Sequence, residues 1–434
     1  MSVSEAASTS EVRGAVEAVW RSQSARIVGA LARYTGDFSL AEDLAQEALA
    51  EALVSWSIHG IPNQPTGWLL TAGRRRAIDA FRRRSARDQR YALLARDLEA
   101  DVPGAEVPGS DVLFDPGAID DNTLALIFVA CHPVLSKEAR VALTLRVVGG
   151  LSSDEIARSF FVPVATIQAR ITRAKKTLAA ARVAFAVPEP HERAERLGSV
   201  LQVLYLIFTE GSFASSGEHW IRHDLSNEAQ RLARVVVRLA PEPEAFGLLA
   251  LMELTAARFP ARVDAAGQPV SLDDQDRRLW DQSAIRRGRA ALDQAARAGR
   301  GLGAFGLQAS IAECHALARS VDETDWPRIV ILYEALGQLA PSPVVELGHA
   351  VAVAMASGPA AGLALVDTLA DRGELGASHL LPSVRGEMLL RLGRLDDARQ
   401  TLRRAVELCG NAPEREALER KIAGIPTPQT RPHT

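Results

Sequence analysis

Two segments of the chain concentrate side chains that could bind nucleic acid. Between Arg74 and Arg90, eight arginines stand against two aspartates, and between Thr166 and Arg182 five basic residues stand without an acid. Arginine and lysine bind phosphate oxygens, and arginine also reads base edges through paired hydrogen bonds. One such run is typically a solvated helix face, but two runs on patterned helices favour DNA binding.

The second basic segment is predicted to be the recognition helix of a helix-turn-helix. Ser152 and Glu155 form a predicted capping box, and Phe161-Val162-Pro163 makes the turn. Helical spacing gives the next helix a buried stripe of Ile167, Ile171, Ala174 and Leu178. The polar and basic side chains that could contact DNA from this helix are Thr166, Gln168, Arg170, Arg173 and Lys176. An ordinary amphipathic helix hairpin is the plain alternative.

The first basic segment follows a loop whose two prolines and two glycines, at 58–67, argue against helix. In the helix after it, the apolar positions leave Arg75, Arg76, Arg82 and Arg83 facing outward. An arginine-faced helix beside a rigid loop suits single-stranded DNA, because arginines hold phosphates and a loop can take an unstacked base. Trp68 is predicted to be a packing residue.

A third surface is acidic. The segment 37–56 has apolar residues on one helix face, and Ser39 with Glu42 is predicted to form a capping box. The other face carries Glu42, Asp43, Gln46 and Glu47, and it is either a solvated face or a docking surface for a partner.

Other chemistry is weakly supported. His219 and His223 could share a helix face as metal ligands, which makes a metal-dependent enzyme an alternative, but no HExxH order accompanies them. The three cysteines, Cys131, Cys314 and Cys409, have neither zinc nor disulfide spacing. We therefore expect no catalytic residue, no metal and no cofactor.

Composition places the chain among ordinary globular proteins. It has 434 residues, 47% apolar and 24% charged, with a net charge of −3, so any affinity for DNA must come from local patches. The start of the chain has no signal-peptide pattern, and the apolar stretch 350–366 is broken by Gly358-Pro359. We expect a cytoplasmic protein without a membrane segment.

The fold is predicted to be all-α, in several parts. The acidic segment with Pro-Gly pairs at 91–121 is a predicted linker between domains at 12–90 and 122–187. A helical extension at 188–295 and a repeat domain at 296–424 complete the chain. Gly386, Gly393, Ala398 and Ala405 fit the small-residue positions of a tetratricopeptide-like (TPR-like) repeat, and 343–371 resembles a degenerate copy.

The first two domains together resemble RNA polymerase sigma factors of the extracytoplasmic-function (ECF) group within the sigma-70 family. DFSLAEDLAQEALAEAL is similar to their helix that docks on core polymerase, and WLLTAGRRRAIDAFRRR to the region 2 helix that meets the −10 element. The helix-turn-helix is similar to region 4, which binds the −35 element. The whole chain resembles a branch of the group with a long C-terminal tetratricopeptide-like extension.

The resemblance implies a role for each surface. Asp43, Gln46 and Glu47 would bind core polymerase, while Asn63 and Gln64, with the loop at 59–66, would hold a flipped −10 base. The four outward arginines would grip −10 DNA, and the five polar residues of the recognition helix would bind the −35 element. The C-terminal half would regulate the factor in cis, with a small regulatory protein or a ligand as its candidate partner.

One alternative from a different class stays open at this point. A stand-alone helix-turn-helix regulator with a ligand- or peptide-binding helical half would bind duplex DNA without polymerase, and its Asp43 face would be inert.

Overall fold

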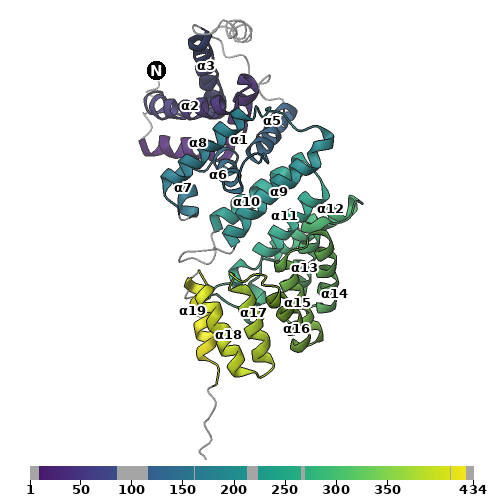
Figure 1. Ribbon diagram of the computed structural model, residues 1–434. Helices are drawn as coiled ribbons and strands as arrows, with labels where there is room; N and C mark the ends of the chain where they lie inside the picture. The colour runs from purple at the N-terminus through teal and green to yellow at the C-terminus, as the bar shows by residue number, and fades with distance from the viewer. Residues whose placement is uncertain are drawn as a thin grey trace, which may run out of the picture. The chain divides into compact units, whose positions relative to one another are not determined.

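The structure is a computed structural model that describes residues 9–85, 116–160, 162–212, 223–264, 269–410 and 412–426. Over these residues the chain forms α-helices, three short 3-10 helices and one isolated bridge between Val263 and Pro269, as the all-α prediction requires (Figure 1). The helices form two compact units, 1–206 and 207–434, which are described separately.

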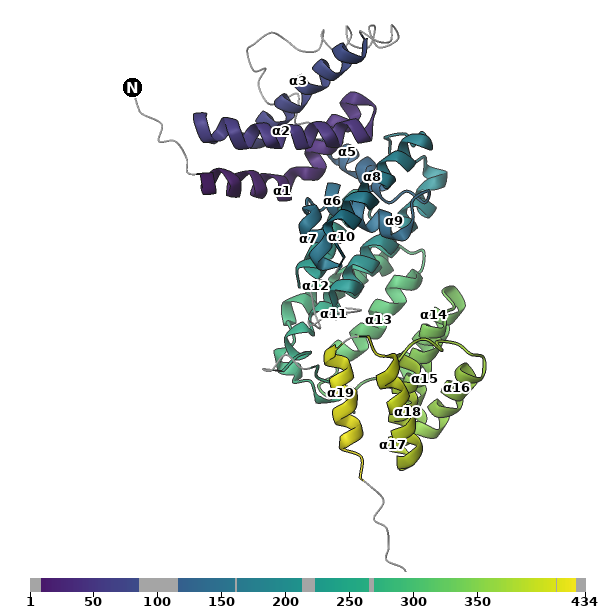
Figure 2. The same ribbon diagram turned by 60° about the vertical axis from the view of Figure 1, so that its left-hand side comes forward.

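The N-terminal unit holds eight helices of the described chain, the last of which continues into the second unit. They are α1 (Thr9–Thr35), α2 (Phe38–His59), α3 (Pro65–Ser85), α5 (Pro116–Ala130), α6 (Lys137–Val147), α7 (Ser153–Ser159), α8 (Val164–Ala180) and α9 (Pro190–Ser212). Helices α1 and α2 lie side by side, and α3 packs against both (Figure 2).

In this first bundle, the predicted capping residue of α2 and the predicted start of α3 are both wrong. Asp37, not Ser39, caps α2, since its carboxylate accepts a hydrogen bond from the Leu40 amide at 3.0 Å. Helix α3 begins at Pro65, inside the segment predicted to be loop, because proline fits the first turn of a helix, where its missing amide needs no partner. The loop is therefore shorter, from Gly60 to Gln64.

The helix-turn-helix is formed by α7 and α8. The capping box is confirmed: the Ser152 amide donates to Glu155 Oε2 at 2.8 Å, and the Glu155 amide donates to Ser152 Oγ at 3.1 Å. The buried stripe of α8 is also as predicted, Ile167, Ile171, Ala174 and Leu178. Helix α5 starts at Pro116, within the segment assigned to the linker; residues 86–115 lie outside the described chain.

The first part of α9 completes the core of the N-terminal unit. Ser199 Oγ donates to the Cys131 carbonyl at 2.7 Å, and Arg196 donates to the Phe128 carbonyl at 3.1 Å. Phe128 lies in the last turn of α5 and Cys131 directly follows the helix, where carbonyl oxygens have no amide partner within the helix. The compact N-terminal unit therefore includes residues beyond 187, the predicted end of the second domain.

The C-terminal unit is a chain of helices in which each packs on the next. They are α10 (His223–Leu239), α11 (Pro243–Ala256), α12 (Gln282–Arg297), α13 (Gly303–Leu317), α14 (Trp326–Leu339), α15 (Pro343–Ser357), α16 (Pro359–Asp371), α17 (Leu380–Arg391), α18 (Leu395–Leu408) and α19 (Ala412–Ala423), with 3-10 helices Phe259–Ala261, Leu272–Asp274 and Arg277–Leu279. The break at Gly358-Pro359 separates α15 from α16, as predicted.

Helices α17 and α18 form the closely packed hairpin that the repeat pattern predicted. Ala398 and Ala405 are fully buried, and a Cβ on Gly386 would lie 2.7 Å from Leu402 Cγ. Only glycine at 386 lets the two helices approach this closely.

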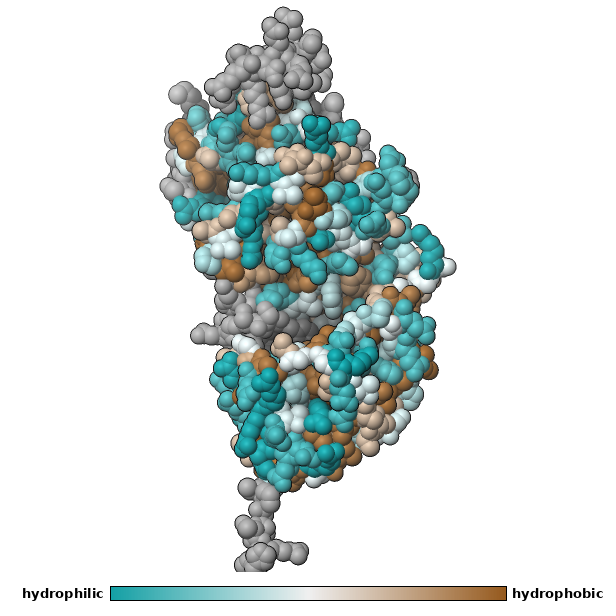
Figure 3. All heavy atoms as spheres, in the orientation of Figure 1, coloured by the Kyte–Doolittle hydropathy of each residue, from teal (hydrophilic) through white to brown (hydrophobic). Residues whose placement is uncertain are grey.

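The described helices include none long and apolar enough to cross a membrane. On the face drawn in Figure 3, small hydrophobic patches alternate with hydrophilic residues.

Candidate nucleic-acid interface

The side chains of α8 that are predicted to read DNA differ in their exposure to solvent. Gln168, Arg173 and Lys176 are exposed, whereas Thr166 and Arg170 are half-buried. Arg173 Nε donates to the Ala169 carbonyl at 3.3 Å, and no side chain caps the helix start at Pro163. The Thr166 amide of the first turn donates to the Pro163 carbonyl at 2.9 Å.

The loop before α3 presents both predicted base-binding side chains. Asn63 and Gln64 are exposed at its end, directly before the first turn of α3. Trp68 in that turn packs edge-on against Trp56 of α2, with ring centroids 5.6 Å apart, as expected for a packing residue. The contact with buried Trp56 thus holds the first turn of α3, which follows the loop directly, against α2.

The arginines of α3 that are predicted to face outward differ in whether they pair with carboxylates of α2. Arg75 and Arg82 are exposed, while the side chain of Arg83 lies outside the described residues. Arg76, predicted to grip DNA, instead forms ion pairs with Glu47 at 2.8 Å and Glu51 at 2.9 Å on α2. Burial alone would lower the pKa of Arg76, but the two carboxylates outweigh burial and raise it. In this structure Arg76 joins α3 to α2.

The acidic face of α2 is smaller than the sequence indicated. Asp43 is exposed, with 62% of its side chain accessible, Glu47 is exposed and Gln46 is half-buried. Glu42, predicted to lie on this face, is buried at 3% exposure. The reason is a pair of cations from the helix-turn-helix part, which sequence spacing alone does not reveal.

These cations join α2 to the helix-turn-helix. Lys175 of α8 forms ion pairs with Glu42 and, at 2.9 Å, with Asp43, and Arg146 of α6 lies 3.6 Å from Glu42. Burial lowers the pKa of Lys175, but the neighbouring carboxylates outweigh that effect and raise it. The amine therefore stays charged at neutral pH, and Asp43, predicted to bind polymerase, is held by the helix that is predicted to read DNA.

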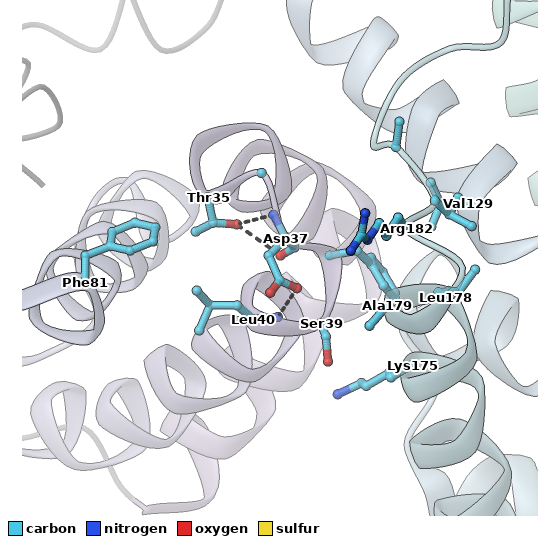
Figure 4. Close-up of a pocket in the computed structure, with 14 residues that line it drawn as sticks. Thr35, Asp37, Ser39, Leu40, Phe81, Val129, Lys175, Leu178, Ala179 and Arg182 are labelled. Carbon is cyan, nitrogen blue, oxygen red and sulfur yellow. Dashed lines mark hydrogen bonds between the residues drawn. The ribbon is translucent and has the colours of Figure 1, made fainter. Parts of the chain in front are cut away.

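A cleft of about 420 Å³ lies beside this contact (Figure 4). Its walls come from the turn between α1 and α2, from Phe81 of α3 and from α8 with the turn that follows it. Lys175 extends from α8 towards the start of α2 in this view. The charged side chains of Asp37, Lys175 and Arg182 are among those that line it.

Helix α1 makes a second contact with the helix-turn-helix part. Arg21 pairs with Glu155, and Ser24 Oγ donates to the Val148 carbonyl at 3.4 Å. A Cβ on Gly150 would lie 3.0 Å from the Trp20 carbonyl oxygen, so only glycine permits this approach. Burial would raise the pKa of Glu155, but hydrogen bonds from Ser152 and the charge of Arg21 hold it below its usual range.

The histidine pair of the enzyme alternative is not brought together by any described contact. His219 lies outside the described residues, and the His223 ring packs edge-on to Phe259 with centroids 5.6 Å apart.

Comparison with known families matches three parts of the chain. Residues 20–87 match "Sigma-70 region 2", residues 125–178 match "Sigma-70, region 4", and residues 196–296 match a family of unknown function, DUF6596. The first match covers α2, its acidic face and α3, and the second covers the helix-turn-helix. No solved structure matches the chain significantly.

Individual relatives agree with the family matches. An "Uncharacterized protein R00370" from Rhizobium meliloti is 43% identical over 388 residues, which is 89% of this chain and 90% of that protein. A "Probable ECF RNA polymerase sigma factor SigI" from Mycobacterium tuberculosis is 28% identical over 179 residues, 41% of this chain and 59% of that protein. An "ECF RNA polymerase sigma factor SigK" from Mycobacterium ulcerans is 29% identical over 157 residues, 35% of this chain and 78% of that protein.

Regions 2 and 4 in this order define a transcription-initiation factor of the sigma-70 class. Within that class, the chain belongs to the ECF group of RNA polymerase sigma factors, and it carries a helical C-terminal extension.

Proposed function

We propose that this chain brings core RNA polymerase to a specific set of promoters, with α2 as the polymerase contact and the α3 and α8 regions as the two DNA contacts. The observation that carries the proposal is the placement of one exposed acidic face and two exposed basic surfaces on separate helices of the region 2 and region 4 parts.

The −35 contact is assigned to α8. Gln168, Arg173 and Lys176 project from the exposed side of the helix, and Thr166 and Arg170 flank them. A recognition helix reads bases in the major groove with residues near its start, and basic residues further along hold the phosphates. Gln168 is the exposed polar residue nearest the helix start, and Arg173 can read a guanine edge through paired hydrogen bonds, so both are candidates for base reading, while Lys176 is the candidate for phosphate binding.

The −10 contact is assigned to the Gly60–Gln64 loop and α3. Asn63 and Gln64 offer amide donors and acceptors for the edge of an unstacked base, while Arg75, Arg82 and Arg83 hold the phosphates beside it. Arg76 has a different role in this proposal, because Glu47 and Glu51 hold it: it keeps α3 at a fixed angle to α2.

The core-polymerase contact is assigned to Asp43, Gln46 and Glu47 on α2. In the structure Lys175 binds Asp43, so full access to this face requires α8 to move away from α2. A promoter-bound factor also needs region 2 and region 4 on separate DNA elements. The proposal therefore includes an opening of the N-terminal unit when polymerase and promoter bind.

The C-terminal half is proposed to regulate this opening in cis, as a TPR-like helical array that takes a small regulatory protein or a ligand. The successive packing of α11 to α19 and the close α17–α18 hairpin support the repeat interpretation. The chain is proposed to act in the cytoplasm, without enzyme activity of its own.

Transcription with purified core polymerase tests the regulatory part of this proposal. Full-length protein is compared with a chain that ends at Leu206, which keeps the α9 residues that hydrogen-bond to the end of α5. Cis regulation predicts a different amount of specific transcript from the two proteins. Equal amounts at every protein concentration, with and without a cell extract as a source of partner, would contradict it.

A further inference from the structure

Three potential metal ligands meet at the end of the C-terminal unit, far from the DNA-binding parts in sequence. His379 precedes α17, Cys409 follows α18 and Glu414 lies in the first turn of α19. Their ligand atoms all lie within 4.8 Å of one another, and His379 Nε2 is 3.1 Å from a Glu414 carboxylate oxygen. In the described part of the chain no other group of three such residues is found.

These three ligand types fit a divalent cation of intermediate hardness, such as Zn²⁺. Imidazole nitrogen, thiolate sulfur and carboxylate oxygen are the ligands that bind Zn²⁺ in proteins, whereas Mg²⁺ and Ca²⁺ take oxygen alone. Metal–ligand bonds of about 2.0–2.3 Å put tetrahedral ligand atoms roughly 3.5 Å apart. Movements of about an ångström would therefore bring the three atoms from their present spacing onto one ion.

The burial of the three side chains suits a site with one open coordination position. Cys409 is 3% exposed, while the side chains of His379 and Glu414 are 21% and 29% exposed. A metal at this point would have sulfur on its protein side and access to water on the other. Three protein ligands would leave the fourth position of a tetrahedral zinc ion to water.

The surrounding structure gives such an ion a mechanical role. Helix α19 contributes only Pro413 to the core, so apolar burial does little to hold it. Polar contacts attach it instead, among them Lys421 with Glu387 at 2.6 Å and Arg415 with the Cys409 carbonyl at 2.9 Å. An ion bound by all three ligands would tie α19 to the ends of both helices of the α17–α18 hairpin.

We propose that His379, Cys409 and Glu414 form a Zn²⁺-binding site that fastens α19 to the α17–α18 hairpin. The inference is independent of promoter recognition, because none of the three residues lies in region 2 or region 4. Zinc binding replaces the thiol proton of Cys409, which is released to solvent, and involves no redox change.

Cobalt binding to the full-length chain tests the site, since Co²⁺ replaces Zn²⁺ and reports its ligands by colour. Protein freed of metal by a chelator is titrated with Co²⁺ and then with Zn²⁺. We expect one Co²⁺ per chain, with the near-ultraviolet absorption of a thiolate–cobalt bond, and loss of that absorption as Zn²⁺ displaces the ion. Cobalt binding without the thiolate absorption, or no binding, would overturn the proposal.

Variants identify the ligands and separate binding from folding. Cys409→Ser should abolish the thiolate absorption, and His379→Gln and Glu414→Gln, both at partly exposed positions, should weaken Zn²⁺ binding by at least about tenfold. Cys314→Ser, which changes another buried cysteine, is the matched control and should bind as the unaltered chain does. If Glu414→Gln and His379→Gln fold normally and bind Zn²⁺ unchanged, the assignment is wrong.

Proteolysis supplies a readout that does not depend on colour. Zn²⁺ should slow tryptic cleavage after Arg415 and Arg420 in α19 of the unaltered chain and of Cys314→Ser, and it should have no effect in Cys409→Ser. Equal protection in all three proteins would mean that the ion acts elsewhere.

Discussion

Two basic side chains of the N-terminal unit lie in segments predicted to bind DNA but form ion pairs with carboxylates of α2. Lys175 stands next to the exposed residues of α8 that we assign to DNA binding, yet it binds Glu42 and Asp43 on α2. Arg76 stands among the arginines of α3, yet Glu47 and Glu51 hold it. A basic residue in a DNA-binding segment is therefore assigned to DNA only after its protein partners are known.

Arg173 and Lys176 should separate base reading from phosphate binding. Arg173→Ala should weaken binding to the cognate −35 sequence by about 1–3 kcal/mol and relax the preference at one base pair. Lys176→Ala should weaken binding to all sequences alike and lower the salt dependence by about one unit of slope. Affinity measured on cognate and altered −35 duplexes at several salt concentrations distinguishes them. An Arg173→Ala loss that is equal on every sequence would assign that residue to phosphate instead.

His315 should make the C-terminal unit sensitive to acid. Burial, helped by the charges of Arg258 and Arg277, lowers the pKa of His315 to about 4, and its ring packs edge-on to Trp326. The unfolded chain binds this proton near pH 6.5, so the stabilisation is complete above that pH and falls as the pH drops towards 4. The loss is at most about 3 kcal/mol.

Urea unfolding of the unaltered chain and of His315→Phe checks this pH dependence. The phenylalanine keeps a ring against Trp326 but cannot titrate. The difference in stability between the two proteins should change between pH 6.5 and 4 and stay constant above pH 7. A difference that is constant across the whole range would show that His315 does not lose a proton on folding.

At the scale of elements, patterns within one helix were predictable and contacts between helices were not. The stripe Ile167, Ile171, Ala174 and Leu178 and the Ser152–Glu155 capping box follow from spacing, because both depend on residues of one segment. The burial of Glu42 depends on Lys175 and Arg146, which are remote in sequence. The same limit applies to His379, Cys409 and Glu414, which match no local metal motif.

The contact between α2 and α8 should oppose polymerase binding. Lys175→Ala removes the ion pairs with Glu42 and Asp43. Of the two cations beside buried Glu42, only Arg146 then remains. Because Glu42 and Lys175 are both largely buried, loss of this pair should weaken the closed arrangement, and we expect core polymerase without DNA to bind the variant at least about tenfold more tightly. Lys176→Ala, the exposed neighbour, is the matched control and should not change this affinity. Weaker or unchanged binding by Lys175→Ala would contradict the proposed opening.

At the scale of the whole chain, the sequence indicated the order of modules better than their limits. Two basic helices around an acidic segment pointed to regions 2 and 4, and the family matches at 20–87 and 125–178 bear this out. The hydrogen bonds of Arg196 and Ser199 to the end of α5 extend the compact N-terminal unit past the predicted limit at Val187, and such tertiary contacts do not follow from spacing along the chain. Domain limits depend on such contacts more than on composition.

The central claim, that this chain gives core polymerase its promoter specificity through α2, is tested most directly by transcription of a genomic promoter pool with mapped start sites. The unaltered chain should yield transcripts at a small set of sites that core polymerase alone does not use. Asp43→Arg should abolish them while its circular dichroism stays unchanged, and Asp293→Arg, at an exposed position of the C-terminal unit, should not. No specific transcripts from the unaltered chain, or full activity of Asp43→Arg, would contradict the account.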